Sequence, residues 1–142
     1  MAENDRSRVL RRALEACVLG EVEALPELFT ADVTGRSPNM LVTSLDELAD
    51  VVAFREAALS DVTVQVDALD VVGNKGYMEY RLSAVFSGPF VIDDDTVVDP
   101  NGQEVRIGAA LVVEFKANKI SRLSHLAGCW RATRDRCSDP TA

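Results

Sequence analysis

His125 is the side chain with the clearest potential for chemistry, and it is the only histidine among the 142 residues. An imidazole has an unperturbed pKa near neutrality, so it can accept or donate a proton at physiological pH. His125 lies in the last apolar segment, where plain alternation would place it on the face opposite Ile120. We expect it to act as a general acid or base, and the alternative is a place on the outer surface or in a subunit contact.

Tyr80 is the second candidate, because it lies on the apolar side of an alternating segment. Its hydroxyl could donate to a ligand carbonyl or support His125, whereas a core tyrosine would bond the backbone instead. Trp130 could close the mouth of a pocket or pack at a subunit contact, and Ser37 and Asn39 could donate hydrogen bonds at the rim.

Large apolar side chains on the same predicted faces form the expected lining of a ligand pocket. These residues are Phe54, Met78, Leu82, Phe86 and Leu111. The charged residues that alternate with them, Glu79, Arg81 and Glu114, are expected on the outer face of the sheet. That outer face also carries Tyr77 and Val112, which predicts a homodimer formed through the sheet.

Composition excludes several classes of function. A net charge of −8 with no Lys/Arg-rich run argues against a nucleic-acid partner and against anionic membranes. The aspartates at 93–95 and 99 lack the spacing and the twelfth-position Glu of a calcium loop, and no Gly-rich phosphate loop is present. We therefore expect no metal and no cofactor.

The three cysteines fit reduced thiols, and the absence of a signal-peptide pattern or a long apolar run predicts a cytoplasmic protein.

The spacing of apolar residues changes along the chain, from the spacing of helices to the alternation of strands, and it predicts the elements that position these residues. Helical spacing covers about 5–19, 21–29 and 44–60, and Ser44 with Glu47 forms a capping box. A short strand is expected at 32–37, between the second and third helices, and four alternating strands follow at about 62–72, 77–86, 105–115 and 120–127, with a turn at 73–76. The expected fold is α+β, a curved antiparallel sheet packed on three N-terminal helices, with one domain over 1–137 and a disordered tail at 138–142.

This order of elements resembles the nuclear transport factor 2-like fold, and in particular its SnoaL-like branch of cone-shaped proteins. Three segments carry the resemblance: 28–34, 101–105 and 112–120. The similarity covers about Ser7 to Ala127 and is specific for the fold rather than for an activity, because this fold hosts many activities.

The resemblance implies where functional residues would lie. Ketosteroid isomerases of similar fold have a general-base Asp at the place of Ser37 and a Tyr near Ala13, so two parts of that chemistry are missing here. Similar limonene-epoxide hydrolases have Arg and Asp at the places of Tyr80 and Leu82, and an Asp at the place of His125. Members of this fold usually have a bulge in the last strand, which would turn Leu123, His125 and Ala127 inward. We adopt that arrangement.

Three hypotheses follow. The first is a cofactor-free lyase, isomerase or cyclase that acts on a small hydrophobic carbonyl compound, with His125 as acid/base and Tyr80 as hydrogen-bond donor. The second is a non-catalytic binder of a small apolar ligand. The third is a dimerising accessory domain without a ligand, which a completely filled interior would favour.

Overall fold

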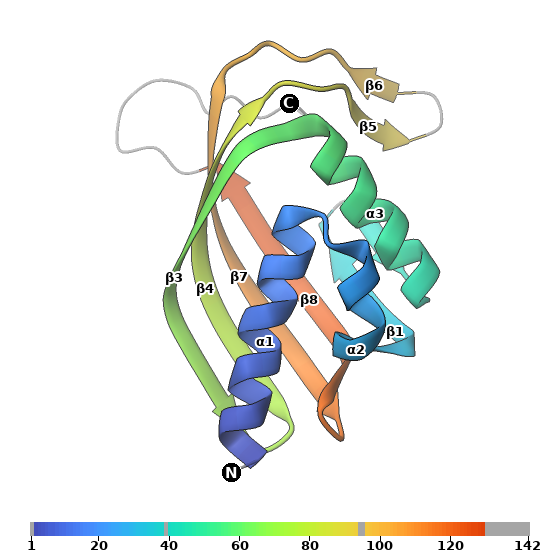
Figure 1. The fold of residues 1–142 in the computed structure, drawn as a ribbon, viewed down its shortest axis with the longest axis vertical. Helices are drawn as coiled ribbons and strands as arrows, with labels where there is room; N and C mark the ends of the chain where they lie inside the picture. The colour runs from blue at the N-terminus through green and yellow to red at the C-terminus, as the bar shows by residue number, and fades with distance from the viewer. Residues whose placement is uncertain (1, 39, 94–95, 130–142) are drawn as a thin grey trace.

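A computed structural model describes residues 2–38, 40–93 and 96–129 (Figure 1). The helices are α1 (Ala2–Leu19), a 3-10 turn (Val22–Ala24), α2 (Leu25–Leu28) and α3 (Leu45–Ala58). The strands are β1 (Phe29–Ser37), β2 (Met40–Val42), β3 (Leu59–Val72), β4 (Lys75–Phe86), β5 (Phe90–Asp93), β6 (Thr96–Val98), β7 (Glu104–Lys116) and β8 (Lys119–Cys129). None of the helices in the described part of the chain is long and apolar enough to cross a membrane.

Six strands form one curved sheet in the order β2-β1-β8-β7-β4-β3. Figure 1 shows the three helices on its concave side, so the expected α+β fold is confirmed. The sheet is mixed rather than wholly antiparallel, because β1 runs parallel to β8. A tight turn at Ala117 and Asn118 joins β7 to β8 and makes that pair antiparallel, and β8 then lies beside β1 in the same direction. The separate hairpin of β5 and β6 continues beyond the long strands, near α3.

The inner face of the sheet follows the predicted alternation. In β4 the even-numbered residues from Gly76 to Phe86 are buried, whereas the odd-numbered residues are exposed or half-buried. The charged residues of the outer face pair with one another: Arg81 donates two hydrogen bonds to the Asp67 carboxylate, at 2.8 and 2.9 Å. Each inward side chain of β4 therefore reaches the space between the sheet and the helices.

The helices close that space with apolar side chains. Leu10 of α1 is fully buried against the sheet, and Val52 of α3 is 3% exposed. Ser44 caps α3 as expected, because its hydroxyl accepts the Glu47 backbone N–H at 3.1 Å. The Glu47 carboxylate accepts a hydrogen bond from the Thr43 hydroxyl, at 2.7 Å.

We predict that Leu10→Ala lowers the free energy of unfolding by about 2–5 kcal/mol, because it leaves a cavity in the core. Leu19→Ala is the matched control, since Leu19 lies on the same helix but is 53% exposed. Its effect should remain within about 0.5 kcal/mol. Urea denaturation followed by circular dichroism measures both, and equal losses would contradict the packing of α1 described above.

Candidate functional site

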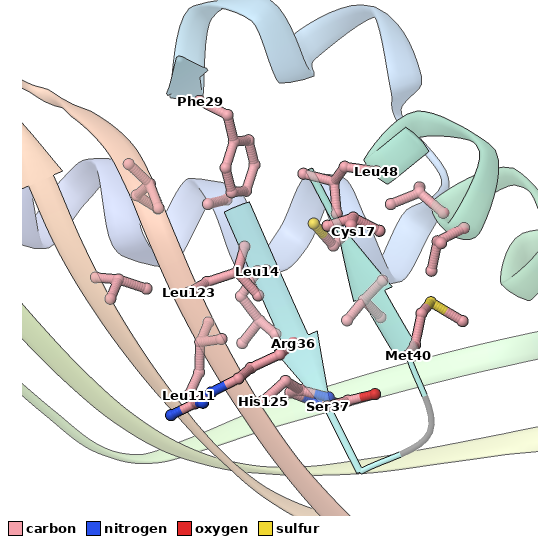
Figure 2. Close-up of a pocket in the computed structure, with 18 of the residues that line it drawn as sticks. Leu14, Cys17, Phe29, Arg36, Ser37, Met40, Leu48, Leu111, Leu123 and His125 are labelled. Carbon is pink, nitrogen blue, oxygen red and sulfur yellow. The ribbon is translucent and has the colours of Figure 1, made fainter. Parts of the chain in front are cut away.

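The concave side of the sheet borders a cavity of about 90 Å³, which is lined by α1, α3 and strands β1, β2, β4, β7 and β8. Figure 2 shows side chains from both helices and from the sheet pointing into it. The lining residues are Ala13, Leu14, Cys17, Val18, Phe29, Gly35, Arg36, Ser37, Met40, Val42, Leu48, Val51, Val52, Arg55, Tyr80, Leu111, Val113, Ile120, Leu123 and His125. Most of them are apolar, so the few polar groups decide what the cavity can recognise.

A bulge in β8 places His125 in this cavity. Phe115 pairs with Ile120 and the preceding Glu114 pairs with Arg122, which leaves Ser121 as an extra residue in β8. One extra residue reverses the phase of a strand, so Ile120 on one side of the bulge and His125 on the other both face inward. Leu123 also lines the cavity, whereas Ala127, expected on the same face, is exposed.

Tyr80 and His125 meet inside the cavity across strand β7. The Tyr80 Oη and His125 Nε2 atoms are 2.6 Å apart, and the two rings are stacked with centroids 6.0 Å apart. The residue of β7 opposite Tyr80 is Ala109, and its small side chain leaves room for the phenol to lean over the strand. His125 is opposite Leu111, the next inward residue of β7. The contact is therefore a diagonal one between β4 and β8.

Burial keeps both groups of this pair uncharged near neutral pH. Loss of solvation and, as the smaller cause, the positive charge of Arg55 together lower the pKa of His125 from 6.5 to about 4. Burial raises the pKa of Tyr80 to about 12, and the Arg55 charge opposes that rise. The pair thus offers one neutral imidazole and one neutral phenol joined by a hydrogen bond.

The site gives less support to a cysteine nucleophile or to a bound metal ion. Burial raises the pKa of the Cys17 thiol to about 11, so the thiolate needed for nucleophilic attack is scarce at neutral pH. Within 2–38, 40–93 and 96–129, no three His, Cys, Asp or Glu residues gather as a metal would require. The reactive groups that the cavity brings together are therefore those of Tyr80 and His125.

The other expected site residues divide into three groups. Ser37 and Leu111 line the cavity with Tyr80 and His125. Met78, Leu82 and Phe86 are buried on the inner face but do not line it. Asn39 and Trp130 lie outside the described residues, as do the expected domain end at 137 and the tail.

The expected place of Phe54 in the pocket is not observed, because its side chain is 51% exposed and does not line the cavity. At about 100° per residue, Phe54 lies about 120° around α3 from the buried Leu48. Arg55, which the sequence reasoning missed, lies only about 20° from Leu48 and lines the cavity. The signal for Arg55 was available: a lone arginine within an apolar helical stripe.

Comparison with known families gives a match over most of the chain. The sequence pattern described as a SnoaL-like domain matches residues 10–123. Comparison with curated proteins gave no match. The matched segment contains the second half of α1, the whole of α3, β4 and β7, and ends just before His125.

Several solved structures share the fold. A provisionally assigned SnoaL-like polyketide cyclase from Jannaschia sp. CCS1 is 16% identical with a TM-score of 0.78, over 89% of this chain and 87% of that one. IdmH from Streptomyces antibioticus, provisionally a polyketide cyclase, is 17% identical with a TM-score of 0.71, over 86% and 91%. An LEH-like epoxide hydrolase from M. tuberculosis is 9% identical with a TM-score of 0.68, over 89% and 84%. At these identities the likeness establishes the nuclear transport factor 2-like fold alone.

We predict that acid destabilises the protein partly through His125. The unfolded imidazole binds a proton below pH 6.5 while the folded one stays neutral until about pH 4, so stability is full above pH 6.5 and falls between these values. At about 1.4 kcal/mol per pKa unit, the loss is on the order of 3 kcal/mol. Urea denaturation at pH 7, 5.5 and 4 measures it. His125→Gln removes the titration, so a variant with the same acid sensitivity as the wild type would contradict the prediction.

Proposed function

Because this chain belongs to the SnoaL-like domain family, we propose that its cavity binds a small hydrophobic carbonyl compound and rearranges it without a cofactor, as a lyase, isomerase or cyclase. The observation that carries the proposal is the 2.6 Å hydrogen bond between Tyr80 Oη and His125 Nε2 at an apolar cavity. Reactions of these classes need a proton to leave one position of the substrate and return to another, which a joined acid and base can provide.

The pair can pass a proton in either direction. In one arrangement Tyr80 donates to Nε2, and its oxygen can accept a substrate proton while its own proton moves to the imidazole. In the other, the neutral imidazole carries its hydrogen on Nε2 and donates it to the Tyr80 oxygen. The phenol O–H can then protonate or polarise a carbonyl oxygen of the substrate. Both begin from neutral groups, so no charge has to be buried before the substrate enters.

A non-catalytic binder of a small apolar ligand is the second candidate, and the apolar lining of the cavity favours it. The open volume of about 90 Å³ argues against the third hypothesis, an accessory domain with a completely filled interior. That volume is below the ~300–1,000 Å³ usual for drug-sized ligands, so either a small molecule or part of a larger one would fit without rearrangement.

Proton exchange provides a test of catalysis that does not require the natural substrate. Small apolar ketones, such as cyclohexanone and 4-methyl-2-pentanone, should exchange the hydrogens next to their carbonyl with D2O faster in the presence of the protein, as NMR can follow. General acid–base groups contribute about 10²–10⁴-fold, so His125→Gln should lower the rate by at least about 100-fold and Tyr80→Phe should also lower it strongly.

Ser124→Ala is the matched control, because Ser124 is the neighbour of His125 in β8 but does not line the cavity. It should leave exchange unchanged. If ketones bind but the wild type does not accelerate exchange, or if His125→Gln equals the wild type, the catalytic proposal fails and the binder remains.

We also propose that the protein forms a homodimer through the outer face of the sheet. Tyr77 of β4 is 37% exposed and pairs with Val112 of β7, which is 44% exposed. Leu126 of β8, paired with Ala110, is 63% exposed. These side chains lie on the outer face of three neighbouring strands, with Leu126 diagonal to Val112, and exposed apolar side chains grouped in this way are typically covered by a partner. We propose separately that the protein is cytoplasmic, as the sequence predicts.

Analytical ultracentrifugation at micromolar concentration should give about twice the chain mass of 15.4 kDa for the wild type. Leu126→Glu should give the monomer, because it would bury a charge in the interface. Leu19→Glu should leave the dimer intact, since Leu19 is 53% exposed on α1, which lies on the concave side of the sheet. A monomeric wild type would count against the proposed dimer.

A further inference from the structure

The charge of the cavity lining is opposite in sign to that of the whole protein. The chain has 23 acidic and 15 basic residues. Yet no Asp or Glu occurs among the described residues that line the cavity, whereas Arg36 and Arg55 do. Arg36 belongs to β1, where its side chain is exposed, and Arg55 belongs to the last turn of α3, where it is half-buried. Arg55 is thus the less solvated of the two cations.

Within the described part of the chain, Arg55 and Arg36 both lack the carboxylate partner that three other arginines have. Arg12 binds the Glu21 carboxylate at 2.8 Å, Arg81 binds Asp67 at 2.8 Å, and Arg106 binds Glu104 at 2.7 Å. Within residues 2–38, 40–93 and 96–129, no ion pair or side-chain hydrogen bond of Arg55 is found. A partly desolvated guanidinium without a carboxylate is ready to bind one, with two parallel hydrogen bonds.

The charge of Arg55 affects the pKa values of the groups that share its cavity. Its positive charge lowers the pKa of His125 and opposes the rise that burial causes in the pKa of Tyr80 and of Cys17, all of which line the same cavity. A ligand that reached Tyr80 and His125 would therefore also come under the influence of the Arg55 charge.

We propose that Arg55 binds a carboxylate of the ligand, so that the cavity selects small apolar carbonyl compounds that also carry a carboxylate. This inference rests on the proposed function and narrows its substrate class. The guanidinium holds the anionic end at α3, and the apolar body of the ligand lies along the lining toward β8 and β4, with its carbonyl at Tyr80 and His125.

A ligand carboxylate bound to Arg55 would also make the His125 imidazole easier to protonate. The titratable or charged groups that line the cavity with His125 are Arg36, Arg55, Cys17 and Tyr80. A carboxylate on Arg55 neutralises the charge that disfavours the imidazolium, so the pKa of His125 should rise when an acid is bound. A neutral ligand would lack this effect.

The test compares two acids with their neutral amides: 3-methylbutanoate with 3-methylbutanamide, and benzoate with benzamide. Calorimetry at pH 7 should show each acid binding at least tenfold more tightly than its amide, and added salt should weaken only the acids. Because the chain has one histidine, NMR of the untagged protein reports the pKa of His125 directly. Saturating acid should raise that pKa and saturating amide should not.

Arg55→Met should remove the preference for the acids, and Arg55→Lys should retain part of it. Arg11→Met, on the exposed side of α1 and outside the cavity, should bind both ligands as the wild type does. Equal binding of acid and amide, binding of neither at 10 mM, or loss of the preference in Arg36→Met rather than in Arg55→Met would overturn the inference. The acid–amide comparison in the unchanged protein stands even where a variant fails to fold.

The outcomes separate this inference from the proposed function. Proton exchange of neutral ketones that depends on His125, without any preference for acids, would sustain the catalysis and reject the role of Arg55. Tight, Arg55-dependent binding of acids without proton exchange would sustain the role of Arg55 and reject the catalysis.

Discussion

The curvature of the long sheet is the constraint on which the other features depend. Strands of 11–14 residues enclose a concave face only if they bend, and β3 bends where its register with β4 shifts, near Asp61 and Asp67. Three helices cover the resulting hollow, with Leu10 buried at its floor. Because the hollow is wider than the helices can fill, a cavity remains where α3 and β8 face each other.

Desolvation in that cavity determines the chemistry. A solvated histidine would be partly charged near neutral pH, whereas His125 is held neutral by burial and by the nearby Arg55. A buried tyrosine needs a polar partner for its hydroxyl, and His125 supplies one at 2.6 Å. The Tyr80 hydroxyl and the His125 Nε2 atom are therefore hydrogen-bonded to each other, so neither of these buried polar atoms is left without a partner.

The order of the helices and strands could be predicted from the sequence, because strand alternation and helix caps depend on neighbouring residues. The inward phase of Tyr80, the Ser44 cap and the outward position of Arg81 could all be predicted from neighbouring residues. Phe54 was misplaced because its hydrophobicity was weighed above its angle on α3, and Arg55 was overlooked for the converse reason. The distance between Tyr80 and His125 could not be predicted, since it depends on two strands separated by 45 residues and on the small Ala109 between them.

The extra residue at Ser121 has a consequence for how such chains diverge. Upstream of it, an insertion or deletion in the β7–β8 turn can be absorbed by the loop, but a single-residue deletion in β8 would exchange the inner and outer faces of the strand's second half. The length of β8 therefore determines which of its positions face the cavity, whatever residue occupies position 125. An alignment that misplaces one gap here would match a relative's inward-facing residue to Ser124 or Leu126, which do not line the cavity.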